Sequence, residues 1–249
     1  MYCDAHIHLF DYFKQSGNAP VPEKDMVFCA SSHDPAEFRW QEEFLQRNPG
    51  QGVISFGIHP QNPESVSRVF LELIIEEKRI SAIGECGFDL FTRDFKAILA
   101  DQKIVWDFQL ELAISSGLPL IVHCRKALDL IFADSRRLSK VSYVVFHGWS
   151  GSLREAHFLL DRGINAFFCA GKSLALGDRS LRQTVTGLPV SRLLTETDAP
   201  YMRSRGEPWS SPHDIFSVAA FTAECAEIDL IEFLNIIHGN FNTVYGIHP

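Results

Sequence analysis

Two histidines near the start of the chain, His6 and His8, are spaced so that both could bind one metal ion. They belong to an apolar run at residues 3–9 that we expect to form a strand. Side chains alternate between the two faces of a strand, so Asp4, His6 and His8 point the same way. Neutral imidazole is the commonest ligand of zinc-like metals. A lone pair of this kind is more often made of surface or packed histidines, so its meaning depends on the rest of the chain.

Residues of the same chemical types stand at the ends of other apolar segments. A histidine or an acidic residue ends or directly follows five further segments that we expect to be strands: His59, Glu85, His123, His147 and Asp198. If His59 is left out, these residues and the first pair together comprise four histidines, namely His6, His8, His123 and His147, and two carboxylates, Glu85 and Asp198. That is more than one ion usually takes from protein, but it suits two divalent ions that share a carboxylate.

The segments that carry these residues alternate with helical segments about eight times. The expected strands are residues 3–9, 26–30, 53–58, 80–85, 118–122, 143–146, 164–169 and 193–197. A loop is expected after the first strand. The expected helices are residues 35–48, which Asp34 would cap, 63–78, 95–116 and 126–138. The rest of the chain, after a loop that contains proline, glycine and arginine, is also expected to be helical. This alternation predicts a single α/β domain over residues 1–249, a TIM-like (β/α)8 barrel, with an open doubly wound sheet as the alternative.

The composition sets the class of protein. An apolar share of 46% is typical of a soluble globular protein, and the sequence contains no apolar run long enough for a membrane helix. The chain start shows no secretion signal, and the six cysteines show no C-x-x-C spacing, so we expect reduced cysteines and a cytoplasmic location.

The formal charge, 23 − 31 = −8, argues against a broad basic face for nucleic acid. It does not exclude a nucleic acid substrate, because bound cations can supply a positive field.

Six motifs occur in order along nearly the whole chain. They are DAHIH at 4–8, GIHP at 57–60, IGECGFD at 83–89, HCR at 123–125, HGWSG at 147–151 and ETDAPY at 196–201. This series resembles the signatures of the TatD family of metal-dependent deoxyribonucleases, within the amidohydrolase-like barrels. Two positions depart from the usual pattern: Phe10 stands where the family usually has an acid or its amide, and Trp149 stands where it usually has phenylalanine.

The resemblance implies a metal-dependent hydrolase with two divalent ions (Mg, Mn or Zn) that cleaves phosphodiester bonds, often from the 3′ end of DNA. It implies His6, His8, Glu85 and Asp198 at one ion, and Glu85, His123 and His147 at the other. DNA or another phosphodiester is therefore the expected partner, and no stable protein partner is evident.

Further residues are assigned roles as hypotheses. Asp198 would take the proton of the attacking water, Glu85 would bridge the ions, and His59 would protonate the leaving group or orient a ligand. Three basic residues would bind substrate phosphates, namely Arg125, Lys172 in a Gly-Lys-Ser turn, and Arg203. Asp89 would either support a ligand or cap a helix. The other histidines, His33, His157, His213, His238 and His248, are expected to be surface or packing residues.

Two alternatives remain open from the sequence. A metal hydrolase of the same architecture could act on an amide, ester or lactone, because an activated water attacks carbonyl carbon as well as phosphorus. The other alternative is a barrel scaffold that has lost catalysis. The complete set of candidate ligands argues against it, and purified protein that bound no divalent metal would favour it.

Overall fold

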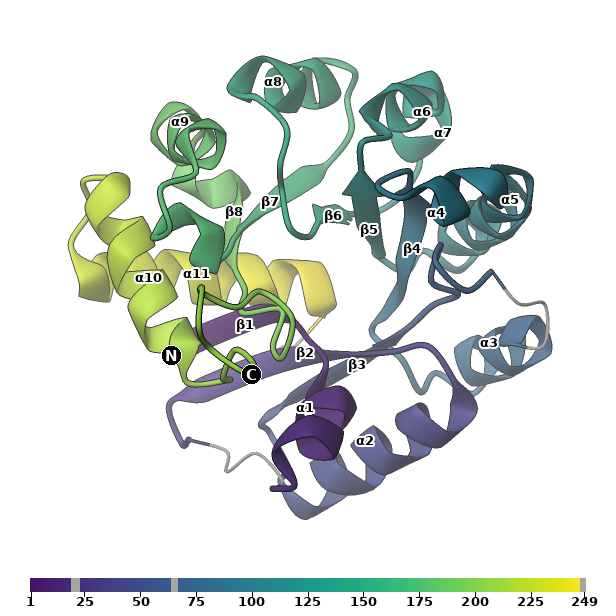
Figure 1. Ribbon diagram of the computed structural model, residues 1–249, viewed down its shortest axis with the longest axis horizontal. Helices are drawn as coiled ribbons and strands as arrows, with labels where there is room; N and C mark the ends of the chain where they lie inside the picture. The colour runs from purple at the N-terminus through teal and green to yellow at the C-terminus, as the bar shows by residue number, and fades with distance from the viewer. Residues whose placement is uncertain (19–22, 64–66, 247–249) are drawn as a thin grey trace.

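The computed structural model describes residues 1–18, 23–63 and 67–246, and in this part of the chain eight parallel strands form one sheet (Figure 1). The strands are β1 (Tyr2–Ile7), β2 (Met26–Ser32), β3 (Gly52–Phe56), β4 (Ala82–Asp89), β5 (Leu120–Arg125), β6 (Val144–Phe146), β7 (Ala166–Ala170) and β8 (Leu193–Thr195). Their spatial order follows the sequence, as expected for repeated βα units.

Helices surround the strands in Figure 1. They are α1 (Leu9–Ser16), α2 (Pro35–Arg47), α3 (Ser67–Glu76), α4 (Arg93–Ala97), α5 (Leu99–Ser116), α6 (Leu128–Ala133), α7 (Ser135–Leu138), α8 (Leu153–Asp161), α9 (Arg179–Gly187), α10 (Asp214–Cys225) and α11 (Leu230–Tyr245), with the 3-10 helices η1 (Lys172–Leu174) and η2 (Val190–Arg192). Among the described residues, no helix is long and apolar enough to cross a membrane.

Hydrogen bonds join the last strand to the first. The Thr195 hydroxyl donates to the carbonyl of Cys3 at 2.6 Å, and the amide of Asp198 donates to the carbonyl of His6 at 3.0 Å. The sheet therefore closes on itself. The predicted TIM-like (β/α)8 barrel is confirmed, and the open doubly wound sheet is excluded.

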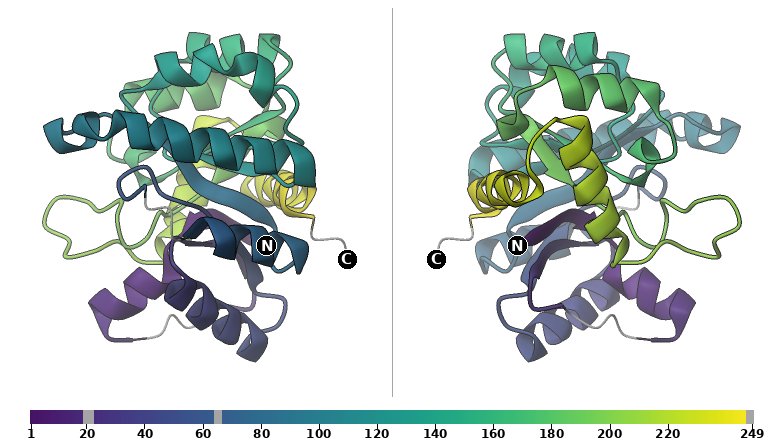
Figure 2. Two further views of the ribbon diagram at one scale, coloured as in Figure 1. Left: turned by 90° about the vertical axis from the view of Figure 1, so that its right-hand side faces the viewer. Right: turned by 90° about the vertical axis from the view of Figure 1, so that its left-hand side faces the viewer.

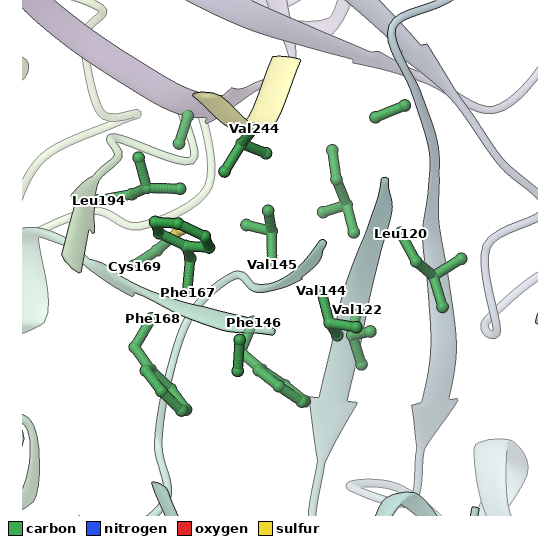
Figure 3. Close-up of a cluster of buried hydrophobic side chains, with 14 of the residues drawn as sticks. Leu120, Val122, Val144, Val145, Phe146, Phe167, Phe168, Cys169, Leu194 and Val244 are labelled. Atoms are coloured by element: carbon green, nitrogen blue, oxygen red, sulfur yellow. The ribbon is translucent and has the colours of Figure 1, made fainter. Parts of the chain in front are cut away.

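The barrel interior below the strand ends is mainly apolar, and the buried carboxyl group of Asp4 is an exception. Figure 3 shows Val145, Phe167 and Leu194 converging with Val244 of α11 in one buried cluster. The last helix thus packs against the core of the barrel. Figure 2 shows α11 on one side of the barrel, with α4 and the loop after β8 on the other. The carboxyl ends of the strands face these loops, as in barrel enzymes generally.

The segment after β1 differs from the expectation. A loop was expected there, but residues Leu9–Ser16 form helix α1. The rings of Phe10 and Phe13 lie 5.5 and 5.2 Å from the ring of Trp40 on α2. This tertiary contact stabilises a helix that is only eight residues long and would not persist alone. Phe10 therefore packs between helices and is not among the residues that line the pocket described below.

Other boundaries shifted by a few residues. Strand β4 continues past Glu85 to Asp89, and the two helices expected at residues 95–116 and 126–138 are each divided, near Ile98 and Asp134. Part of the helix expected at residues 63–78 is α3, whereas residues 64–66 lie outside the described residues.

Gly57 permits a close approach between β3 and β4 beside the strand ends. A Cβ atom at Gly57 would overlap the backbone of Gly84 and lie 2.9 Å from the carbonyl oxygen of Glu85. We expect Gly57→Ala to lower the free energy of unfolding by about 1–3 kcal/mol, because the two strands must separate. Urea denaturation measures this change.

Gly239 provides the matched control. It lies inside α11, where an added Cβ meets no atom within 4 Å, so Gly239→Ala should leave stability unchanged or raise it by up to about 1 kcal/mol. Equal unfolding midpoints for Gly57→Ala and the unsubstituted protein would show that the strands are not in close contact there.

Candidate metal centre

A pocket of about 580 Å³ opens at the carboxyl ends of the strands. His8, Glu85, His123, His147 and Asp198 line it, and His6 lies fully buried at its base, in contact with them. The structure therefore brings all six residues of the predicted ligand set together, although they are spread over nearly 200 positions of sequence.

Glu85 lies at the centre of this set, with each carboxylate oxygen facing a different group. Its Oε2 atom lies 3.5 Å from Nε2 of both His6 and His8. Its Oε1 atom lies 2.6 Å from Nε2 of His147 and also contacts Nδ1 of His123. This is the arrangement required of a carboxylate that bridges two cations, one held on each oxygen.

The first group of donors contains His6, His8 and Asp198. The two Nε2 atoms are 3.1 Å apart, and Oδ1 of Asp198 lies 3.7 Å from that of His6 and 3.4 Å from that of His8. Ligands bound tetrahedrally at zinc-like distances are about 3.3–3.5 Å apart. These donors are therefore separated by the distances that one shared ion imposes.

The second group contains His123 and His147, whose facing nitrogens are 3.1 Å apart. The other ring nitrogen of His123 lies 3.2 Å from Oδ2 of Asp89, so this carboxylate fixes the orientation of the imidazole. Asp89 also accepts hydrogen bonds from the side chain of Gln61 at 2.8 Å and from the amide of Phe91 at 2.8 Å. Asp89 thus supports a candidate ligand and orders the loop after β4.

Irregularities in two strands direct the ligands into the pocket. The register between β1 and β2 shifts between Asp4 and Ile7, and the register between β4 and β5 shifts between Ile83 and Cys86. Gly84, with φ 119°, lies within the second shift, where a Cβ would overlap the carbonyl of Ile121. Such bulges re-aim side chains next to active sites, and here one lies directly before Glu85.

The side chains of the centre alter one another's pKa. Burial disfavours a charge on Glu85, but the surrounding imidazoles, His147 foremost, outweigh it and lower the pKa of the carboxyl well below its usual range. Burial lowers the pKa of His6 to about 4. For His8 and His147, burial is outweighed by nearby carboxylates, which raise the pKa to about 9 and about 10. A cation must displace protons from these two rings, because imidazole binds metals in its neutral form.

Two further histidines lie beside the bridging carboxylate. Nε2 of His59 lies 3.2 Å from Oε1 of Glu85, and Nε2 of His33 lies 3.6 Å from Oε2. His33 was expected to be a surface or packing residue, and the structure instead places it in the pocket. The difference comes from the strand boundary: β2 ends at Ser32, two residues later than expected, so His33 directly follows its carboxyl end.

The three basic residues assigned to substrate lie in different surroundings. Arg125 lines the pocket, with Nη1 3.7 Å from Oδ2 of Asp89. The ammonium of Lys172 is paired with Glu207 at 2.6 Å and Asp214 at 2.8 Å, and it is not among the pocket residues.

Arg203 donates to the carbonyl of Pro208 and lines a separate surface groove with Arg205.

Glu196, whose burial raises its pKa to about 7, accepts a hydrogen bond from the amide of Gly148 at 2.6 Å. The histidines His157, His213 and His238 are not among the pocket residues, and His248 lies outside the described residues.

Comparison with known proteins places this centre in a family. A family model described as "TatD related DNase" matches residues 3–246. The chain belongs to the TatD family. It is therefore a hydrolase of phosphodiester bonds, and the family implies divalent metal ions. The resemblance inferred from the six motifs is confirmed.

TatD relatives cover most of the chain. A "3′-5′ ssDNA/RNA exonuclease TatD" of Klebsiella pneumoniae (strain 342) is 33% identical over 208 residues, which is 77% of this chain and 76% of the relative. A protein of the same description from Pantoea vagans (strain C9-1) is 30% identical over 225 residues, covering 85% of this chain and 84% of the relative.

Solved structures share the fold. A TatD homologue from Escherichia coli K12 superposes with a TM-score of 0.81 at 24% identity, covering 99% of this chain and 98% of the other. A TatD family hydrolase from Entamoeba histolytica gives a TM-score of 0.76 at 19% identity, with 98% and 97% covered.

Metal binding at this centre should stabilise the folded protein. Its donors converge only in the folded chain, so an ion present at about 100 times its dissociation constant stabilises the protein by about 2.7 kcal/mol. We expect saturating Mn²⁺ or Zn²⁺ to raise Tm by about 5–10 °C over the chelated protein in calorimetry. Glu85→Gln should reduce this metal-induced rise. Identical transitions with metal and with chelator would contradict binding at the centre.

Proposed function

We propose that this TatD protein is a 3′–5′ exonuclease of single-stranded DNA or RNA that uses two divalent ions bridged by Glu85. The observation that carries the proposal is the division of one buried carboxylate between two groups of donors. The single-stranded substrate and the polarity follow the activity for which the Klebsiella and Pantoea relatives are named.

The two groups supply one ion site each. His6, His8 and Asp198 would hold the first ion with Oε2 of Glu85, and His123 and His147 would hold the second with Oε1. Bound ions would lower the pKa of water to about 7 and act as Lewis acids toward phosphate oxygens. Of Mg, Mn and Zn, the four imidazoles favour Zn most, because Mg and Mn are better suited to oxygen ligands and water.

Asp198 is placed to accept the proton of the attacking water. Its side chain is 16% exposed to the pocket, whereas that of His6 is fully buried. Its backbone has φ 53°, a left-handed conformation that is uncommon outside glycine and that is often retained at functional sites. The hydrogen bond from its amide to the carbonyl of His6 maintains this conformation.

His59 and Arg125 complete the chemistry from the chain's own residues. His59 contacts Oε1 of Glu85 and lines the pocket, so it can orient the bridge or protonate the leaving oxygen. Arg125 offers a guanidinium to a phosphate at the rim. Lys172 and Arg203 have no part in this mechanism, because one is neutralised by two carboxylates and the other lies in a separate groove.

The compartment remains a prediction from the cysteines. All six are free thiols, and five of them are buried. Buried thiols without disulfides favour a reducing compartment such as the cytoplasm.

Metal analysis tests the number of ions. We expect two equivalents of Zn or Mn in the reconstituted protein by plasma mass spectrometry. His147→Gln should reduce this to about one equivalent, because the second group then keeps only His123 and the shared carboxylate. His157→Gln, on the outer face of α8, is the control and should keep two. A single equivalent in the unsubstituted protein would exclude a dinuclear centre.

Labelled oligonucleotides test the reaction. We expect single-stranded DNA or RNA with a 3′ label to release labelled mononucleotide first, while 5′-labelled strands shorten stepwise. Asp198→Asn should lower kcat at least about 100-fold, because the proton acceptor is lost. Asp229→Asn, which keeps a helix-capping side chain at α11, should retain full activity.

Two results would contradict the proposal. Internal cuts without release from the 3′ end would exclude the polarity. Hydrolysis of esters, amides or lactones with no cleavage of nucleic acid would favour the carbonyl hydrolase alternative.

A further inference from the structure

Two exposed aromatic rings flank the metal centre. Among the phenylalanine, tyrosine and tryptophan side chains of the described residues, Phe91 at 50% and Tyr201 at 51% are the most exposed, and the others are buried or half-buried. Tyr201 lines the pocket, and the Phe91 ring lies 4.2 Å from the guanidinium carbon of Arg125, which also lines it. The chain therefore exposes aromatic surface where a substrate would enter.

Hydrogen bonds anchor the backbone that carries the Phe91 ring. Its amide donates to Oδ1 of Asp89 at 2.8 Å, and the neighbouring amide of Leu90 donates to the carbonyl of Arg125 at 2.9 Å. The other oxygen of Asp89 contacts His123, a candidate ligand of the second ion. A short chain of hydrogen bonds thus connects the exposed ring to the second half of the centre.

Positive charges accompany this ring. The guanidinium of Arg125 and the ammonium of Lys126 lie 4.2 and 4.7 Å from the ring centre, and both residues are exposed. Within the described residues, Lys126 forms no ion pair, and Arg125 approaches only Asp89, at 3.7 Å. In a chain of net charge −8, this cluster leaves two cations available to an anion.

Tyr201 occupies the corresponding place at the first half of the centre. Its ring packs edge-on against His8 with centroids 5.0 Å apart, and its hydroxyl donates to Asp11 at 2.6 Å. A phosphodiester bound between the two ions carries one nucleoside on each side. The two rings flank that position.

We propose that Phe91, Arg125 and Lys126 form a nucleotide subsite beside the second ion, in which a base stacks on Phe91 and the adjoining phosphate binds the two cations. The inference rests on the proposed nuclease function. Stacking on an aromatic ring tolerates every base, so this subsite is not sequence-specific. It requires a base free of a complementary strand, and it therefore selects single strands.

Substitution of Phe91 tests the stacking. Phe91→Leu keeps an apolar side chain but removes the π face, and we expect KM for a ten-residue oligothymidylate to rise about 5- to 100-fold with little change in kcat. Phe91→Trp should restore KM. Ile231→Ala, at an apolar position on α11 that is 72% exposed, is the control and should change neither value.

Oligonucleotides with one abasic residue locate the subsite. For the unsubstituted enzyme, removal of the base at one position near the 3′ end should raise KM by the same factor as Phe91→Leu. With Phe91→Leu, that position should no longer matter, because the ring that contacted the base is already absent.

Salt dependence tests the two cations. Each phosphate contact that is lost should reduce the slope of log KM against log salt by about 0.7 for a single strand. We expect this for Arg125→Gln and for Lys126→Gln. Lys140→Gln, at the exposed turn that enters β6 from the opposite end of the barrel, should leave the slope unchanged.

The outcomes separate this inference from the proposed function. If the unsubstituted enzyme releases nucleotides from 3′ ends but Phe91→Leu has the same KM and the same abasic profile, the subsite is disproved and the nuclease function stands. If the enzyme cleaves no single-stranded nucleic acid, both fall.

Discussion

The convergence of imidazoles on one buried carboxylate is the constraint on which the site depends. Glu85 is 2% exposed, and side chains from five other strands or strand ends approach its two oxygens. A buried charge is costly unless opposite charge or hydrogen bonds compensate it. The same concentration of donor atoms favours the binding of divalent cations, which would compensate the charge of the carboxylate and coordinate the rings.

A second buried carboxylate fixes the first strand of the barrel against the segment that follows the last strand. Asp4 is fully buried, and it accepts hydrogen bonds from the amide of Thr197 at 3.0 Å and from its hydroxyl at 2.6 Å. Asp4 lies two residues before His6, and Thr197 directly precedes Asp198. The interaction therefore joins β1 to β8 and sets the separation of two candidate ligands that are 192 residues apart in sequence (198 − 6). The contact that helps to close the barrel therefore also brings the first group of donors together.

The two departures from the usual family residues are explained by packing. Phe10 packs on Trp40 of α2. Trp149 lies against Phe168, with ring centroids 4.8 Å apart, and donates to the hydroxyl of Thr184 on α9. Neither residue is among those that line the pocket, so both changes alter contacts between helices and strands while the ligand set is retained. The loop after β8 instead supplies Tyr201 to the pocket.

The sequence by itself determined the barrel, the family and the set of candidate ligands. Apolar segments of strand length recur with helical segments between them, and each candidate ligand stands at or near a segment end. The position of a residue along the chain was therefore sufficient to select it as a candidate ligand. Tertiary structure decided the rest. Helix α1 forms because Phe10 and Phe13 meet Trp40, Lys172 is neutralised by carboxylates 35 and 42 residues away, and His33 enters the pocket because β2 continues to Ser32. The opening pair His6 and His8 became candidate ligands only together with the residues at the other strand ends, and their approach to one oxygen of Glu85 depends on a bulge in β4 and on the closed barrel. These are long-range contacts, which no local pattern records.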